Sequence, residues 1–162
     1  MRLNAVMKSP LVVVALLLML VQGAYASAMM TLVPNAELVG EARLKVVFFK
    51  IYDAQLFAPQ GRYSPYDPYC LRLTYLIDAK KNRIISQTVK EMRRMEVASA
   101  EQIDRWIPKM EAAFISMAKG SQADFIHTPD GRLTLVANNV VISVIDDTAL
   151  AKAIMDIWLG PK

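Results

Sequence analysis

The feature that most constrains the fold is the spacing of apolar residues, which changes twice along the chain. In residues 70–78 apolar and polar side chains alternate with a period of two, which is typical of a half-buried strand. Between residues 82 and 117 they recur every three to four positions, which is typical of amphipathic helices. Strand-forming segments separated by turns return from residue 123 to residue 145. Strands and helices grouped in this way predict an α+β fold with a mainly antiparallel sheet.

The predicted strands are marked by composition and by turns. Residues 37–58 are rich in β-formers and too long for one average strand, so they predict a bent hairpin or two abutting strands, broken near Lys45 or Lys50. Gly131 lies in a Pro-Asp-Gly turn, where glycine supplies the positive φ. The remaining predicted strands are 70–78, 123–128, 132–137 and 140–145.

Three helices are predicted. Residues 82–95 place apolar side chains on one face and basic ones on the other. A second helix begins after Ser99, whose hydroxyl serves as N-cap, and is expected to end at Gly120. Asp146 or Asp147 caps a final helix.

The N-terminus has the layout of a secretory signal peptide. A basic start precedes an unbroken apolar run over residues 11–21, and small residues around Ala26 and Ala28 offer two cleavage sites. The rival interpretation is a membrane anchor, but eleven residues at 1.5 Å each are too short for a bilayer core of about 30 Å. We therefore predict a signal peptide over residues 1–28, one domain over residues 29–162, and a periplasmic or secreted location.

Composition excludes several classes of protein. With 54% hydrophobic residues the 162-residue chain is not disordered. Removal of residues 1–28 leaves 17 basic and 15 acidic residues, a net charge of +2 that does not favour nucleic acid as a partner. Its single cysteine, Cys70, and single histidine, His127, leave little with which to build a disulfide framework, a metal centre or a His-based triad. We predict no metal and no cofactor.

Arg43 is the most informative charged residue. It stands between Ala42 and Leu44 in a strand-forming segment, and burial of an unpaired charge is very costly. Arg43 therefore either reaches water at a sheet edge or holds an anion. A second group of basic residues also has two interpretations, a solvated helix face or a contact with anionic lipid head groups: Lys80, Lys81, Arg83, Lys90, Arg93 and Arg94.

The order of motifs resembles the bacterial chalcone isomerase-like proteins. The resemblance is carried by Gly40-Glu-Ala-Arg43, by Phe49-Lys-Ile-Tyr-Asp-Ala-Gln-Leu-Phe-Ala-Pro59, by the strand at residues 71–75 with its following helix, and by the ending Ile157-Trp-Leu-Gly160. It spans about residues 36–160. It implies an open-faced β-sandwich, in which an antiparallel sheet has helices packed on one face.

The same resemblance implies two functions. In plant chalcone isomerases an arginine facing the ligand cleft stabilises an oxyanion, and Arg43 looks like its counterpart; active members carry a threonine where this chain has Tyr52. A non-enzymatic branch binds fatty acids and uses arginine and tyrosine for the carboxylate. If Arg43 and Tyr52 both face the cleft, they supply those groups.

We therefore expect an exported, non-catalytic binding or accessory protein for a fatty acid or another hydrophobic carboxylate, with Arg43 and Tyr52 as ligand-binding residues. The alternative is an isomerase of chalcone-like or other enone substrates, which needs an acid or a positioned water near the developing enolate. A third interpretation is a structural protein whose cleft is filled by its own side chains.

Overall fold

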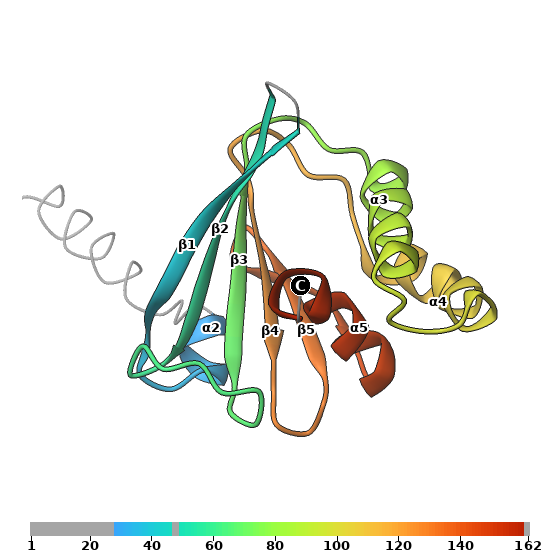
Figure 1. Cartoon of the computed structure of the whole chain (residues 1–162). Helices are drawn as coiled ribbons and strands as arrows, with labels where there is room; N and C mark the ends of the chain where they lie inside the picture. The colour runs from blue at the N-terminus through green and yellow to red at the C-terminus, as the bar shows by residue number, and fades with distance from the viewer. Residues whose placement is uncertain (1–27, 47–48, 161–162) are drawn as a thin grey trace, which may run out of the picture.

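The structure, a computed structural model, describes residues 28–46 and 49–160 and confirms the α+β fold. Six strands form one antiparallel sheet in the order of the sequence (Figure 1). The strands are β1 (Ala36–Val46), β2 (Phe49–Pro59), β3 (Tyr69–Tyr75), β4 (Gln122–His127), β5 (Leu133–Ala137) and β6 (Val140–Ile145). The helices are α2 (Ala28–Leu32), α3 (Lys81–Arg94), α4 (Ala100–Ala113) and α5 (Thr148–Leu159).

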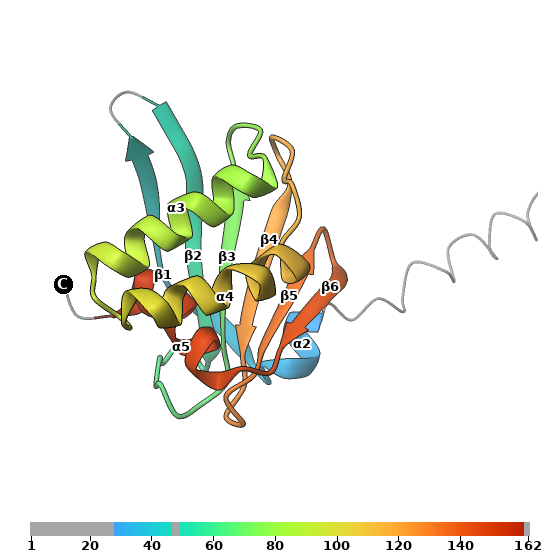
Figure 2. The same cartoon turned by 90° about the vertical axis from the view of Figure 1, so that its right-hand side faces the viewer.

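The sheet has a thickly covered face and a thinly covered one. Helices α3, α4 and α5 pack on one face, called the inner face here, where residues such as Leu73, Phe125 and Leu135 form the main core (Figure 2). On the outer face the short helix α2 covers a small cluster that includes Cys70 and Ile126. Strand residues alternate between the two clusters because successive side chains point to opposite faces of a strand.

The long apolar segment is a hairpin, as predicted. β1 and β2 pair antiparallel, with Arg43 opposite Asp53 and Leu44 opposite Tyr52. The register shifts between Leu38 and Gly40, and again after Leu44, so strict alternation along β1 does not hold. The predicted break near Lys45 or Lys50 agrees with the end of β1 at Val46 and the start of β2 at Phe49, two residues that pair with each other.

The prediction that the second helix runs to Gly120 is wrong. α4 ends at Ala113, and Phe114 is already extended, with φ −91° and ψ 153°. Phe114 and Met117 are buried as expected of a helical stripe, but they are buried from an extended segment. Met117 pairs with Ala79 through two backbone hydrogen bonds of 2.8 Å, and this bridge replaces the last turns of the helix.

The other helix ends follow the sequence. Ser99 accepts a hydrogen bond from the backbone N–H of Gln102 at 3.2 Å, and Asp147 caps α5. The predicted signal peptide lies outside the described residues apart from Ala28, where α2 begins. Among the described helices none is both long and apolar enough to cross a membrane.

Candidate functional site

A small apolar cavity lies between the inner face of the sheet and the helix layer. Its volume is about 20 Å³, room for roughly one water molecule. The lining comes from strands, from α3 and from the extended segment after α4: Tyr75, Ile84, Phe114, Ile115, Met117, Ala123, Phe125, Leu135, Val136 and Ile142. Since none of these side chains is charged, the cavity offers a surface for a hydrocarbon.

Tyr52 faces the same layer as this cavity. It is partly buried against the main core, and its ring lies 6.1 Å from that of Tyr75, which lines the cavity. Its hydroxyl oxygen accepts a hydrogen bond from the indole N–H of Trp158 at 3.0 Å. Burial raises the pKa of Tyr52, and it raises the pKa of Tyr75 to about 12, so both hydroxyls keep their protons at neutral pH. Tyr52 is thus a neutral donor beside an apolar space.

Arg43 lies on the opposite face of the sheet. Its guanidinium forms a two-pronged ion pair with the carboxylate of Asp53, with Nη2 to Oδ2 at 2.6 Å. Its side chain is 43% exposed. Because Asp53 and Tyr52 are neighbours on β2, their side chains point to opposite faces. The condition that Arg43 and Tyr52 face one cleft is therefore not met.

The hollow around Arg43 is of a different kind from the inner cavity. It is an open depression of about 500 Å³, and its lining is mostly polar and carries both signs of charge: Glu41, Ala42, Arg43, Asp53, Gln55 and Thr74. The Asp53 hydrogen bond and charge raise the pKa of Arg43, as expected for a cation that already has an anionic partner. This depression is larger than the inner cavity but less suited to an acyl chain, because charged side chains line it.

A second arginine–carboxylate pair lies on the outer face, and the sequence analysis missed it. Arg72 on β3 meets Asp124 on β4 through two hydrogen bonds of 2.7 Å. The side chains are only 17% and 5% exposed, and the guanidinium lies 5.6 Å from the ring centre of Phe57. The polar positions in the two strands were visible in the sequence, but that they face each other depends on the strand register.

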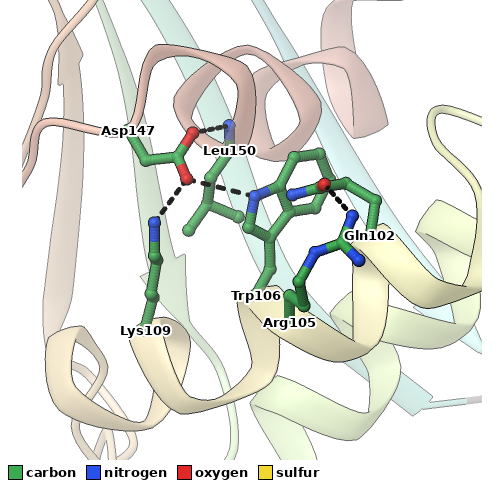
Figure 3. Close-up of polar contacts among 6 residues, drawn as sticks. All are labelled: Gln102, Arg105, Trp106, Lys109, Asp147 and Leu150. Carbon is green, nitrogen blue, oxygen red and sulfur yellow. Dashed lines mark hydrogen bonds and ion pairs between the residues drawn. The ribbon is translucent and has the colours of Figure 1, made fainter.

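The helical hairpin α3–α4 is fastened to the rest of the protein at several places, of which two concern the cavity and the final helix. One is the Ala79–Met117 bridge beside the cavity. At the other, Asp147 accepts hydrogen bonds from the indole N–H of Trp106 at 3.2 Å and from Lys109 at 2.6 Å (Figure 3). Asp147 also caps α5 by accepting from the backbone N–H of Leu150. Burial opposes ionisation of Asp147 and by itself would raise its pKa. The hydrogen bonds that Asp147 accepts, above all the one from Lys109, outweigh burial and hold the pKa below its usual value.

The residues with metal or redox chemistry do not gather at the cavity. His127 stacks on Tyr69 with ring centres 4.9 Å apart, and its buried Nδ1 has no hydrogen-bond partner among the described residues. Burial lowers the pKa of His127 and raises that of the Cys70 thiol, which lies in the outer cluster. Over residues 28–46 and 49–160, no group of three or more His, Cys, Asp or Glu side chains could hold a metal ion.

Comparison with known proteins places this architecture in a family. A family model described as chalcone isomerase-like matches residues 28–162. The fold is similar to the crystal structure of a fatty-acid binding protein from Arabidopsis thaliana, with a TM-score of 0.57 and 11% sequence identity over 80% of this chain and 82% of that chain. No curated protein gives a significant sequence match. At such low identity the structural likeness shows the fold alone, whereas the family model spans most of the sequence: the chain belongs to the chalcone isomerase-like family.

Proposed function

We propose that this protein is an exported, non-catalytic binding protein for a fatty acid or a similar hydrophobic carboxylate. The observation that carries the proposal is the inner cavity, whose lining is entirely uncharged and which has the neutral Tyr52–Tyr75 pair beside it. The acyl chain would lie against Phe125 and Met117. The Tyr52 hydroxyl would donate a hydrogen bond to the carboxylate. The similarity to a plant fatty-acid binding protein supports this ligand class.

The cavity as described is too small for such a ligand. Binding pockets commonly have volumes of about 300–1,000 Å³. The layer between helices and sheet must therefore widen by movement of the α3–α4 hairpin. The Ala79–Met117 bridge is the natural hinge because it joins both ends of that hairpin beside the cavity.

Titration with a fluorescent long-chain polyene fatty acid tests the proposal. We expect saturable binding at one site, which Ala123→Leu weakens strongly by filling the cavity. Ala137→Leu is the matched control, since Ala137 lies opposite Ala123 in the next strand and is equally buried but does not line the cavity. Absence of saturable binding, or equal affinities for Ala123→Leu and wild type, would overturn the proposal.

The same assay separates the roles of Tyr52 and Arg43. Tyr52→Phe should weaken binding of the acid about five- to tenfold and leave its methyl ester unaffected, because a donor to the carboxylate is lost. Arg43→Met should leave acid affinity unchanged if Arg43 serves only Asp53. A large loss of acid affinity in Arg43→Met would instead make Arg43 the carboxylate anchor expected from the sequence.

The isomerase alternative receives no support from an observation at the cavity. It needs a group that stabilises an oxyanion, and the arginine that resembles the family's catalytic one lies on the outer face beside Asp53. Incubation with hydroxychalcones should give no rate of isomerisation above that in buffer.

The proposal of export rests on the N-terminal pattern alone. The N-terminal sequence of the protein recovered from cells should begin after Ala26 or Ala28.

A further inference from the structure

The positive charge of this protein is concentrated around α3. Residues 80–94 contain six basic residues and one acidic residue, Glu91, a net charge of +5. The whole chain has a formal charge of +4, so the rest of the sequence carries −1. A single helix with its N-cap therefore accounts for more than the entire net charge.

The basic residues of α3 form a line. Lys80, Arg83, Gln87, Lys90 and Arg94 follow one another at alternating spacings of three and four, which places them along one side of a helix. All five are exposed, and the stripe is about 20 Å long at 1.5 Å per residue. The buried residues of α3, Ile85, Thr88 and Met92, lie on the opposite side of the helix, so this stripe points away from the core.

Three of the six cations around α3, including Arg94 at the end of the stripe, are already engaged. Lys81 donates to the backbone carbonyl of Glu111 at 2.7 Å, Arg93 pairs with Asp104, and Arg94 pairs with Glu91. In contrast, Lys80, Arg83 and Lys90 form no ion pair with any residue in the described part of the chain. These three charges are therefore available to an external anion.

The basic stripe borders the inner cavity. Ile84, which lines the cavity, directly follows Arg83 in sequence, and its backbone N–H bonds to the carbonyl of Lys80 at 3.0 Å. Ile115, also in the lining, is 41% exposed. A flat anionic surface in contact with the stripe would thus lie close to an apolar opening.

We infer that the Lys80–Arg83–Lys90 stripe docks the protein on an anionic lipid surface and presents the Ile84–Ile115 side of the cavity to it. Basic side chains are attracted to anionic lipid, and each contributes a similar increment near the surface. The stripe has no aromatic side chain on which bases would stack, and it adjoins an apolar rim, so lipid is favoured over nucleic acid. The transfer of an acyl chain rests on the proposed function, whereas docking itself does not.

Vesicle co-sedimentation tests the inference, with phosphatidylcholine vesicles prepared with and without phosphatidylglycerol. The test variant is Lys80→Gln/Arg83→Gln/Lys90→Gln. The control, Arg62→Gln/Arg132→Gln/Lys152→Gln, loses the same charge from exposed positions on the β2–β3 loop, the β4–β5 turn and α5. All proteins are purified from the same expressing host and share one N-terminus, so any contribution of that segment cancels between them. Circular dichroism and melting temperatures verify that both variants fold.

We expect wild type and control to bind vesicles with phosphatidylglycerol far better than those without it. The test variant should lose about 100-fold in affinity for the anionic vesicles, as expected for three charges near such a surface. Raising NaCl from about 0.05 M to about 0.5 M should weaken wild-type binding strongly, because salt screens exposed charges.

Three results would overturn docking: no preference for anionic vesicles, equal losses in both triple variants, or tighter binding to a DNA duplex than to anionic vesicles. The fatty-acid titration on the same proteins separates this inference from the proposed function. If the test variant binds free fatty acid normally but not vesicles, both stand. If wild type docks on vesicles but binds no fatty acid, only the proposed function fails.

Discussion

The two cross-strand arginine–carboxylate pairs should differ sharply in their effect on stability. Both are two-pronged and join neighbouring strands on the outer face, but Arg72–Asp124 is 17% and 5% exposed, whereas Arg43–Asp53 is 43% and 33% exposed. Removing one partner of a buried pair leaves the other charge without compensation in a poorly solvated place. Removing one partner of an exposed pair leaves a charge that water can solvate.

For Arg72→Met we expect a loss of about 3 kcal/mol in the free energy of unfolding, the lower end of the range for breaking a buried pair, because the guanidinium retains some contact with water. At about 3 °C per kcal/mol for a domain of this size, the melting temperature should fall by about 10 °C. Met keeps an apolar contact with Phe57, so the loss reports the charge of Asp124 rather than an empty space. Arg43→Met should leave the melting temperature unchanged within error.

The double variant Arg72→Met/Asp124→Leu gives the decisive control, since it removes both charges together. It should recover most of the loss of Arg72→Met, because replacing a buried pair by apolar side chains is often neutral. Urea unfolding followed by circular dichroism measures all four proteins. Equal shifts for Arg72→Met and Arg43→Met, or a double variant less stable than Arg72→Met, would refute the reasoning from burial.

Three further predictions concern stability. Asp147→Ala should lower the free energy of unfolding by about 2–3 kcal/mol, because it removes the N-cap of α5 and leaves the Trp106 N–H unpaired. The control is Asp146→Ala at the exposed neighbouring position, which should lower it by less than about 0.5 kcal/mol. His127 has a pKa lowered by burial, with Asp130 opposing, so the unfolded state takes up the proton first and stability should fall as the pH drops below about 6.5. NMR titration of this single histidine should give the lowered pKa. His127→Phe should remove the pH dependence of the urea midpoint between about pH 7.5 and 5, because Asp130 and Asp147, whose pKa values are lowered, stay ionised over that range. Gly131→Ala should lower the melting temperature, because φ is +84° and the added Cβ would lie 2.7 Å from Thr148 Cγ2, whereas Gly40→Ala, with no atom within 4 Å of its Cβ, should not.

Local rules recovered much of the fold from the sequence. The hairpin of β1 and β2, the strand of period two at β3, and the start of α3 each follow from apolar spacing over a few residues. Ser99 and Asp147 cap helices because a short polar side chain can bond a free backbone N–H within its own turn. Such features need no information from distant residues.

The candidate site was harder to predict because it depends on faces and registers. The sequence singled out Tyr52 as a ligand-binding residue, and that role stays a prediction. Its partners Trp158 and Tyr75 come from distant elements, and apolar spacing does not say which strand meets which helix. For Arg43 the sequence left an exposed edge and an anion contact both open. In the structure both apply: the Arg43 side chain is partly exposed to solvent, and it forms an ion pair with Asp53 from the neighbouring strand.

The sequence by itself determined the order of strands and helices, the caps and the turns, since these are set by interactions between residues near each other in the chain. Tertiary structure decided the rest. It ended α4 at Ala113, because Phe114 and Met117 are buried from an extended segment that pairs with Ala79. It also placed Arg43 and Tyr52 on opposite faces of the sheet. Their separation of nine positions in the sequence does not determine these faces, because each shift of register in β1 turns the following side chains to the other face. Burial and charge pairing between distant segments are properties of the packed molecule, so only the packed molecule reveals them.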